Sequence, residues 1–446
     1  MSNDRPIGGR AFRLGLLFLP SSALLAAVSL LIACISGSRG REQPLWRDRW
    51  CQPLLLAGLL MLIGACLAEN AGLAWAGLAN WLPFIWAFWA FQPHLEGTRQ
   101  RRQAVWMLLA GTLPVLVTGF GQMLLGWEGP WQVGGGAIIW FLHPDGRPIG
   151  RLSGLFDYAN ITGAWLAVVW PLMLAAVLRP DGWRRRGSAV LLCMATALAV
   201  LLTQSRNAMG ALVLALPFVL GSWQWMWLFP LLLILASPLL LAVLPGVPAG
   251  LQQWGMRLLP DQLLVRVLES QGETAWKHTR LGQWQYALQL VAARPWFGWG
   301  AAAFSVLYPI HAAKRWHGHV HNLPLELAVS HGLPAMLLVV GTVLLLLVLA
   351  SQRGMLQKPP LERAWWAATL VLVVMHGTDL PLFDGRLNIL GWTLLAGLCA
   401  FIRESGPDRD APAAFRSERT PEVDPGQDSG RLPGRMDHLI PRGRRW

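Results

Sequence analysis

The stretch HNLPLELAVSHGLPAMLLVVGTVLLLLVLA, from His321 to Ala350, decides the fold class of this chain. From Leu333 onward it carries no charged side chain, and an apolar run of this length is a candidate transmembrane helix. Similar solid blocks recur along the 446 residues, of which 54% are hydrophobic and 14% charged. A soluble domain carries about 25% charged residues, and a β-barrel shows alternating rather than solid apolar segments. The sequence therefore predicts an all-α, polytopic membrane protein with about 11 transmembrane helices, between roughly 10 and 12.

Arginine-rich loops set the expected topology. The candidate spans cover residues 14–34, 53–68, 72–91, 104–126, 158–178, 188–203, 208–221, 223–244, 323–350, 361–381 and 387–402. Short loops at 99–102, 179–186 and 353–363 are rich in arginine, which places them in the cytoplasm by the positive-inside rule. Alternation then places the loops outside the membrane at 127–157, 204–207 and 245–322. One conflict follows: the arginines of 39–49 also favour the cytoplasm, so a single first span would leave Arg5, Arg10 and Arg13 outside.

These features divide the chain into three parts. Residues 1–126 form an N-terminal transmembrane bundle. Residues 127–402 form a second membrane domain that includes the external loop 245–322. Residues 403–446 are rich in Pro, Gly, Asp and Arg with little apolar periodicity, which predicts a disordered cytoplasmic tail.

Composition narrows the class of partner. The formal net charge of +13 would favour nucleic-acid binding in a soluble protein. Here the positive residues lie mostly in short loops and the tail, so membrane lipids are the expected partner and nucleic acid is not. Most of the 26 Trp, Trp365 and Trp366 among them, are expected to anchor the ends of spans at the membrane interface. The five Cys form no CxxC pair, so neither a disulfide framework nor a zinc site is indicated.

The residues with the clearest chemistry stand just ahead of the quoted run. His321 and Asn322 lie where the long external loop meets it, and a neutral imidazole can accept a proton near neutral pH. Upstream, the segment 279–295 predicts a helix that begins near Arg280, ends at Pro295 and lies on the membrane surface. Leu281, Trp284, Leu288 and Val291 would share one face of it. Arg280 is then either a headgroup contact or a ligand for an anionic substrate.

Two further polar segments belong to the same expected side. Arg206 lies in the tight turn 203–207 between two apolar runs, as either a solvated turn residue or a phosphate ligand. Arg151 and Asn160 flank the entry to the span at 158–178. Asn160 needs a hydrogen-bond partner inside that run, and another helix can supply it.

Other clusters have simpler interpretations. A metal site is not favoured at the histidines, because no cysteine and no obvious acidic ligand joins His311, His317, His319 and His321. A second external set comprises His376, Asp379, Asp384 and Arg386. There, an Asp–Arg pair that braces a helix end is the expected arrangement.

Together these motifs resemble the O-antigen ligase/polymerase superfamily of bacterial envelope glycan assembly. Its members typically show an Arg-Gly-Asn segment entering a span, a Ser-Arg turn, and a periplasmic Arg-x-x-x-Trp helix followed by Pro-x-x-Gly-x-Gly. A His-Asn-x-x-Leu-Glu…Gly motif then begins the next span. Here these motifs are Arg151 to Asn160, Ser205-Arg206, Arg280 with Trp284, Pro295 with Gly298 and Gly300, and His321-Asn322 with Leu325, Glu326 and Gly332. The resemblance covers about 150–350, so 127–402 is expected to be an O-antigen ligase-related domain.

The resemblance implies a metal-independent glycosyltransferase of the bacterial inner membrane that needs no cofactor and has a periplasmic active face. Its donor would be a glycan on a polyprenyl pyrophosphate, and its acceptor lipid A–core or another glycan. His321 would be the general base, and Arg206, Arg280 and, more weakly, Arg151 would bind the pyrophosphate. The supporting residues would be Asn160, Asn322 and Glu326.

Three other functions remain open for the chain. It can be a polymerase of the same superfamily, a relative of cyanobacterial inorganic-carbon transporters, or a non-catalytic scaffold. A transporter needs polar groups near mid-membrane on broken helices. Because the ionisable groups gather at the outer surface instead, surface catalysis is favoured. The sequence leaves the sugar and the oligomeric state open.

Overall fold

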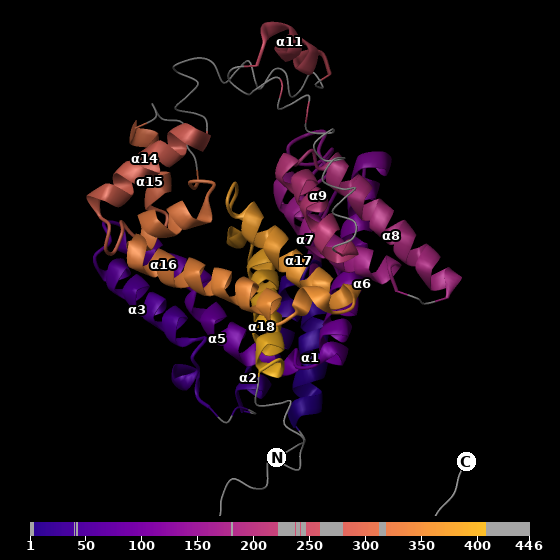
Figure 1. The fold of residues 1–446 in the computed structure, drawn as a ribbon, viewed down its shortest axis with the longest axis horizontal. Helices are drawn as coiled ribbons and strands as arrows, with labels where there is room; N and C mark the ends of the chain where they lie inside the picture. Colours follow the sequence, from indigo (N-terminus) through magenta and orange to yellow (C-terminus); the bar gives the residue numbers. More distant parts are fainter. Residues whose placement is uncertain are drawn as a thin grey trace, which may run out of the picture. The chain divides into compact units, whose positions relative to one another are not determined.

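A computed structural model describes residues 4–39, 41, 43–179, 182–221, 237, 241, 247–258, 280–311 and 318–406 of the chain (Figure 1). The α-helices and strands are α1 (Asp4–Phe18), α2 (Ala23–Arg39), α3 (Gln52–Cys66), α4 (Ala71–Gly77), α5 (Leu82–Phe91), α6 (Thr98–Leu125), β1 (Trp131–Val133), β2 (Ile138–Trp140), α7 (Ala159–Val177), α8 (Trp183–Leu202), α9 (Arg206–Leu220), α11 (Ala249–Leu258), α14 (Arg280–Ala293), α15 (Ala303–His311), α16 (Leu323–Gln352), α17 (Pro360–Met375) and α18 (Gly385–Glu404). Short 3₁₀ turns cover Leu45–Arg47, Leu78–Asn80, Gln92–His94, Met355–Gln357 and Pro381–Phe383.

Helices dominate the described residues, in agreement with the all-α prediction. Within them, six helical stretches are long and apolar enough to cross a membrane: Ala71–His94, Thr98–Leu125, Ala159–Val177, Trp183–Leu202, Leu323–Gln352 and Gly385–Glu404. Three shorter apolar helices are Ala23–Arg39, Gln52–Cys66 and Arg206–Leu220. The expected count of about 11 spans stays a prediction. The span expected at 223–244, most of the external loop 245–279 and the tail beyond Gly406 lie outside the described residues.

The first expected span, 14–34, is wrong, because two helices stand where the sequence predicted one. α1 and α2 are joined by a turn in which Ser21 and Ser22 donate backbone hydrogen bonds to Phe18 O. The pair is antiparallel and tightly packed: Gly8 lies against Ser36, and Gly15 lies against Leu30. The arginines of α1 and Arg39 therefore lie at the same end of the hairpin. This removes the topological conflict without an external N-terminus.

The quoted stretch forms α16, but Gly332 interrupts its helical backbone with φ 84° and ψ 164°. The break frees backbone groups that a helix would satisfy, and the loop after α14 takes them up. Trp299 N and Gly300 N donate to Val329 O and Ser330 O, and Leu333 N donates to Pro295 O. The long stretch thus becomes a short segment before Gly332 and a longer one after it, and the loop that follows α14 is fixed against the break.

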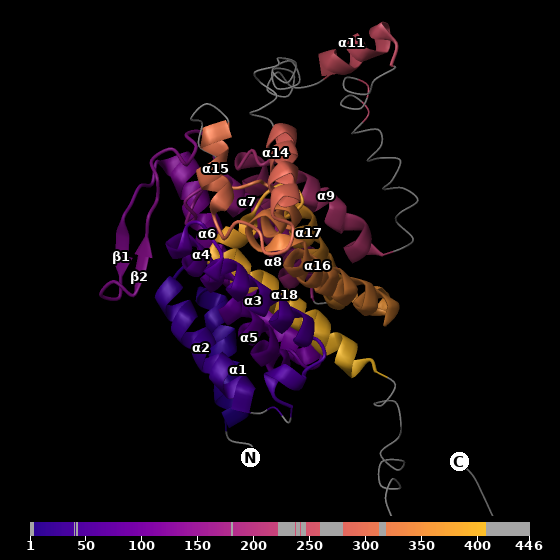
Figure 2. The same cartoon turned by 90° about the vertical axis from the view of Figure 1, so that its left-hand side faces the viewer.

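The end of the bundle that the sequence predicts to lie outside, called the outer end from here on, also carries a small antiparallel ribbon that the sequence did not predict; the opposite end is called the inner end. β1 and β2 pair Trp131 with Trp140 and Val133 with Ile138 (Figure 2). The ribbon is tied to the α1–α2 turn, because Trp140 Nε1 donates to Ser21 O and Ser22 Oγ donates to Ala137 O.

The opposite, inner end is held by buried ion pairs. Arg101 on α6 is 1% exposed and donates to Glu362 on α17 and Glu404 on α18, with N–O distances of 2.9 Å to each. Arg403 pairs with the buried Asp48. Because α18 continues to Glu404 and Ser405 O accepts from Arg353 Nη1 at 2.7 Å, the ordered chain extends past the expected start of the tail at 403.

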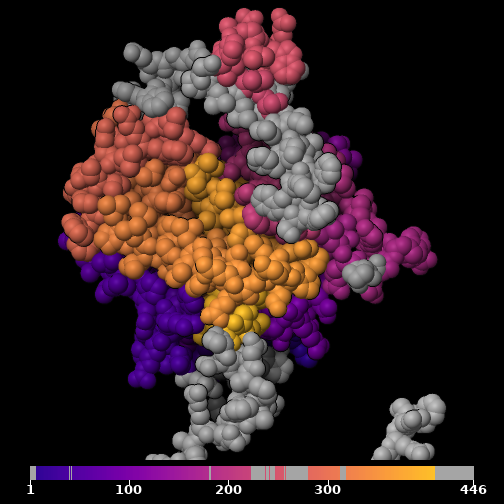
Figure 3. Space-filling view, in the orientation of Figure 1, coloured from indigo at the N-terminus to yellow at the C-terminus, as the bar shows by residue number. Residues whose placement is uncertain are grey.

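α16 and α17 run across the middle of the face seen in Figure 3, with the N-terminal helices below and α14 and α15 above them. The outer ends of α7, α9, α16, α17 and α18 meet on one side of the bundle. These helices join an arginine-rich inner end to a polar outer end, and the candidate residues gather at the outer one.

Candidate functional site

His321 is held by a carboxylate. Its Nδ1 lies 2.9 Å from Oδ1 of Asp379, in the loop that follows α17. The His321 side chain is 26% exposed and that of Asp379 is 16% exposed, so the pair lies at the edge of the protein interior. His321 also has a positive φ of 56°, which non-glycine residues seldom adopt and which is found often at functional sites.

The backbone next to His321 is fixed from both sides. Val320 N donates to Glu326 Oε2 at 3.0 Å, and Trp284 Nε1 donates to Val320 O at 3.0 Å. Trp284, from the Arg-x-x-x-Trp helix, and Glu326, from the histidine motif, therefore both bond the backbone of Val320, the residue before His321. Glu326 is buried and does not bond the imidazole itself.

The backbone after His321 is joined to the end of α17. Asn322 caps α16 by accepting from Leu325 N at 3.0 Å, and its Nδ2 donates to Gly377 O at 2.9 Å. Leu323 N donates to His376 O. Asn322 thus supports the histidine by fixing its segment against the Asp379 loop, whereas the residue that orients the ring is Asp379.

The charge on Asp379 decides which imidazole nitrogen carries the proton. Burial raises the pKa of this carboxyl, but the neighbouring His319 and His321 side chains and the charge of Arg280 outweigh it and hold the pKa well below its ordinary value. An ionised carboxylate only accepts, so Nδ1 of a neutral His321 is the donor. Nε2 then keeps its lone pair and can act as a base.

Arg280 is the first described residue of α14, and its charge acts on Asp379. Its side chain is exposed, which leaves it accessible to a substrate at this surface. His321 and Arg280 are 41 positions apart in the sequence. Both interact with Asp379, which lies in the loop after α17.

Arg206 is the first residue of α9, directly after the cap Ser205, whose side chain accepts from Ala208 N. The neighbouring Asn207 donates to Met375 O at 3.3 Å, so the start of α9 is joined to the end of α17. Asp379 follows four residues after Met375. The exposed Arg206 side chain therefore belongs to the same outer surface as the His321–Asp379 pair.

Arg151 and Asn160 stabilise the turn that carries Arg206. Arg151 Nε donates to Thr203 O at 2.7 Å, and Arg151 Nη2 donates to Asn160 Oδ1. Asn160 is thus satisfied by Arg151 rather than by another helix. These contacts support the position of the Ser205-Arg206 turn, and the part of Arg151 in phosphate binding stays a prediction.

The glycines of the Pro-x-x-Gly-x-Gly turn and of the histidine motif meet where α16 is broken. Gly298 has φ 68°, and a Cβ there would lie 2.6 Å from His331 N. A Cβ on Gly332 would lie 2.2 Å from Trp296 O. Neither position has room for a side chain, which explains in physical terms why the two motifs contain glycine.

The prediction that Leu281, Trp284, Leu288 and Val291 share one face of α14 is only half correct. Trp284 and Val291 pack inward, but Leu281 is 53% exposed and Leu288 is 57% exposed. α14 packs on α15 and α16 through a face that also includes Ala287 and Leu290, and these form a small core with Phe304, Tyr308, Val320, Ala328 and Val329. The spacing of apolar residues in the sequence could not show which of them pack on α15 and α16 and which face the membrane.

Three metal-ligating side chains gather at the site. Ligand atoms of His319, His321 and Asp379 all lie within 4.8 Å of one another, and His319 Nε2 is 3.6 Å from Asp379 Oδ1. The sequence argument against a metal did not anticipate an acidic partner, and Asp379 supplies one. His317 lies outside the described residues, and His311 stacks on Tyr286 instead.

The expected Asp–Arg brace is present beside this site. Asp384 caps α18 and pairs with Arg386 at 2.6 Å. Arg386 also donates to Leu155 O and lies over the Phe156 ring, 3.9 Å from its centroid, so it joins the start of α18 to the loop before α7.

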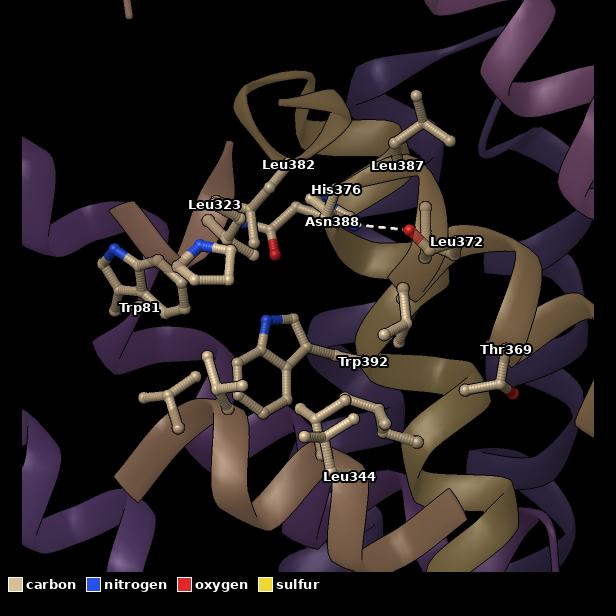
Figure 4. A pocket seen from close by; sticks show the side chains of 17 residues that line it. Trp81, Leu323, Leu344, Thr369, Leu372, His376, Leu382, Leu387, Asn388 and Trp392 are labelled. Atoms are coloured by element: carbon tan, nitrogen blue, oxygen red, sulfur yellow. Dashed lines mark hydrogen bonds between the residues drawn. The ribbon is translucent and has the colours of Figure 1, made fainter. Parts of the chain in front are cut away.

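A small apolar cavity of about 100 Å³ lies below the histidine segment (Figure 4). Residues from α16, α17 and α18 surround it, and Trp81, Leu323, His376, Asn388 and Trp392 are among them. His376 Nδ1 bonds Leu372 O at 2.7 Å.

Comparison with known proteins agrees with the motifs. Residues 189–340 match the family model described as O-antigen ligase. Through this segment, the match supports membership of the O-antigen ligase superfamily. No curated protein matches the chain. The matched superfamily segment contains Arg206, Arg280 and His321, whereas Arg151, Asn160 and Asp379 lie outside it. A sequence signal for Asp379 was present, since it was among the external polar residues, but nothing in the spacing linked it to His321.

Proposed function

We propose that this protein is an O-antigen ligase-type glycosyltransferase of the bacterial inner membrane. It moves a glycan from a polyprenyl pyrophosphate to a sugar hydroxyl, with lipid A–core as the acceptor, at the periplasmic face. The observation that carries the proposal is the His321–Asp379 pair with Arg280 beside it. O-antigen ligase superfamily membership and the membrane helices support the substrate class in general terms.

The chemistry follows from the tautomer that Asp379 selects. His321 Nε2 takes the proton of the acceptor hydroxyl as its oxygen attacks the anomeric carbon. The bond from that carbon to the phosphate oxygen breaks, and polyprenyl pyrophosphate leaves with the electron pair. Displacement in one step inverts the anomeric configuration. Asp379 stabilises the imidazolium that forms, by the same charge that orients the ring.

Negative charge grows on the departing pyrophosphate. Arg206 and Arg280 are the proposed clamp, since guanidinium groups bind phosphate through paired N–H donors and are most effective where water is scarce. Arg151 is a weaker third ligand, and its bonds to Thr203 and Asn160 support the Arg206 turn. Asn322 and Glu326 position the histidine segment.

The transfer is proposed to proceed without a metal, although His319, His321 and Asp379 have a donor set that zinc accepts. A bound metal at Nδ1 would replace the Asp379 hydrogen bond. Purified protein treated with a chelator should therefore keep its transferase activity, and added zinc should inhibit it. Loss of activity on chelation, restored by a metal, would assign the three residues to a metal centre instead.

The decisive experiment is deletion of the gene, followed by gels of lipopolysaccharide and of lipid-linked glycan. A ligase deletion removes the long ladder while the donor accumulates. A polymerase of the same superfamily leaves one repeat on the core, and a bicarbonate transporter-like protein changes neither. Complementation with His321→Ala should fail and with the wild type succeed. A non-catalytic scaffold predicts that the His321→Ala gene complements fully.

A further inference from the structure

A large groove opens between α6, α7 and α8, away from the His321 site. Its volume is about 1090 Å³, which is at the upper end for ligand pockets. Most of its lining is apolar, and Trp106, Leu113, Val117 and Leu191 on its walls are between 42% and 72% exposed. No helix of the described residues covers these side chains.

Three arginines stand at one end of this groove. Arg102 lies in the first turns of α6, Arg179 follows α7, and Arg185 lies in the first turn of α8. Among the described residues, no carboxylate lines the groove. Its charge thus complements an anion at one end, and its apolar walls complement hydrocarbon along the rest.

The groove is deep enough for the acyl chains of one leaflet of a bilayer. Its α8 lining runs from Arg185 to Ala195, a rise of about 15 Å, and its α6 lining runs from Arg102 to Phe120, a rise of about 27 Å, whereas half the hydrocarbon core is about 15 Å. The arginine end is the inner end of all three helices, the end at which Arg101 also lies. By the positive-inside rule this end faces the cytoplasm, where anionic headgroups attract basic residues.

We propose that this groove binds an anionic phospholipid of the cytoplasmic leaflet. Its phosphate lies among Arg102, Arg179 and Arg185, and its acyl chains lie along α6 and α8. The lipid fills the space between α6 and α8, which both pack on α7. The site is separate from the proposed transfer reaction and depends only on the inner position of the arginine loops.

The test uses full-length protein delipidated in a neutral detergent, with phosphatidylglycerol or phosphatidylcholine added and bound lipid measured by native mass spectrometry. The wild type should retain phosphatidylglycerol in preference. Arg102→Gln, Arg179→Gln and Arg185→Gln combined should weaken its binding by about 100-fold, since each basic residue near a headgroup contributes about fivefold. Ala195→Phe, which narrows the apolar part, should weaken the binding of both lipids without changing the headgroup preference.

A matched control removes the same charge from outside the groove. Arg99→Gln, Arg184→Gln and Arg186→Gln combined should leave phosphatidylglycerol binding within about twofold of the wild type, since these side chains do not line the groove. An equal loss of phosphatidylglycerol binding in the two triple variants would mean that only the general positive charge of this surface matters, and it would overturn the proposal. Equal retention of phosphatidylcholine, or displacement of phosphatidylglycerol by a polyprenyl phosphate, would overturn it as well.

Discussion

Asp379→Asn is the most informative change in the candidate site. The substitution keeps the size of the side chain and removes the charge that orients His321. The new carboxamide can offer either an oxygen or an N–H group to Nδ1, so the ring is no longer held in the tautomer with a free Nε2. We expect normal expression and insertion, because the neighbouring backbone bonds of Asn322 and Leu323 do not involve the Asp379 side chain.

The size of the effect follows from the single bond that is lost. A hydrogen bond to a charged group contributes about 1.5–3 kcal/mol. At about 1.4 kcal/mol for each factor of ten, the rate should fall about 10- to 150-fold. His321→Ala removes the base itself and should cost about 10²–10⁴-fold. Because the two residues act as one unit, the double variant should be no slower than His321→Ala alone.

The assay is transfer from a lipid-linked glycan to its acceptor by protein reconstituted in liposomes, with initial rates compared. Asp384→Asn is the matched control, since asparagine also caps helices well and Asp384 bonds Arg386 rather than the histidine. Full activity of Asp379→Asn would refute the orienting role. Additive losses in the double variant would show that Asp379 acts independently of His321.

Four further outcomes are expected. Arg206→Lys should slow transfer substantially at an unchanged protein level, because lysine lacks the bidentate fork of arginine. Transfer at the wild-type rate would mean that Arg206 only stabilises its turn. Gln271→Cys should react with a membrane-impermeant thiol reagent in intact spheroplasts, in a chain whose exposed Cys66 is replaced by serine. Labelling only after permeabilisation would mean that the predicted topology is inverted. Gly332→Ala should lower the thermal stability and the activity, because its Cβ would meet a backbone oxygen, and an unchanged melting temperature would contradict the packing of the broken helix. Truncation after Gly406 should preserve insertion and glycan phenotype, and loss of either would give the tail a function.

The sequence predicted the membrane class and that the polar motifs share one end of the helices, because both follow from long apolar runs and arginine-rich loops. It failed at the first span, because the apolar run from Leu14 continues through the α1–α2 turn without a charged residue to mark it. The Gly332 break was equally hidden, since its cause is a loop that packs against α16 from more than 30 positions upstream.

Tryptophan shows the same difference between composition and packing. Trp365 was expected at the membrane interface, yet it is 0% exposed and donates to Leu394 O, and Trp366 donates to Leu347 O. A Trp ring with its one N–H donor fits either at the membrane interface or inside a helix bundle. Which of the two it occupies depends on the hydrogen-bond acceptors and side chains around it.

The candidate site was predicted in its parts but not in its connections. His321, Arg280 and Arg206 were identified by residue type and position. Their link required contacts across the chain: Asp379 to His321, Trp284 to Val320, and Asn207 to Met375. Asn322 and Glu326 were expected only as supporting residues, and each bonds the backbone near His321 rather than the imidazole.

The buried arginine at the inner end has a consequence for biosynthesis. Arg101 is made early during translation, but its partners Glu362 and Glu404 are made 261 and 303 residues later. A buried charge without its counterions is strongly unfavourable in a membrane. A nascent chain that stops before α17 therefore retains an unneutralised cation, and one that stops before the last turn of α18 lacks the second of the two carboxylates that bond Arg101. The last helical turn of α18, which carries Glu404, therefore completes the set of ion pairs that begins with one of the first residues of α6.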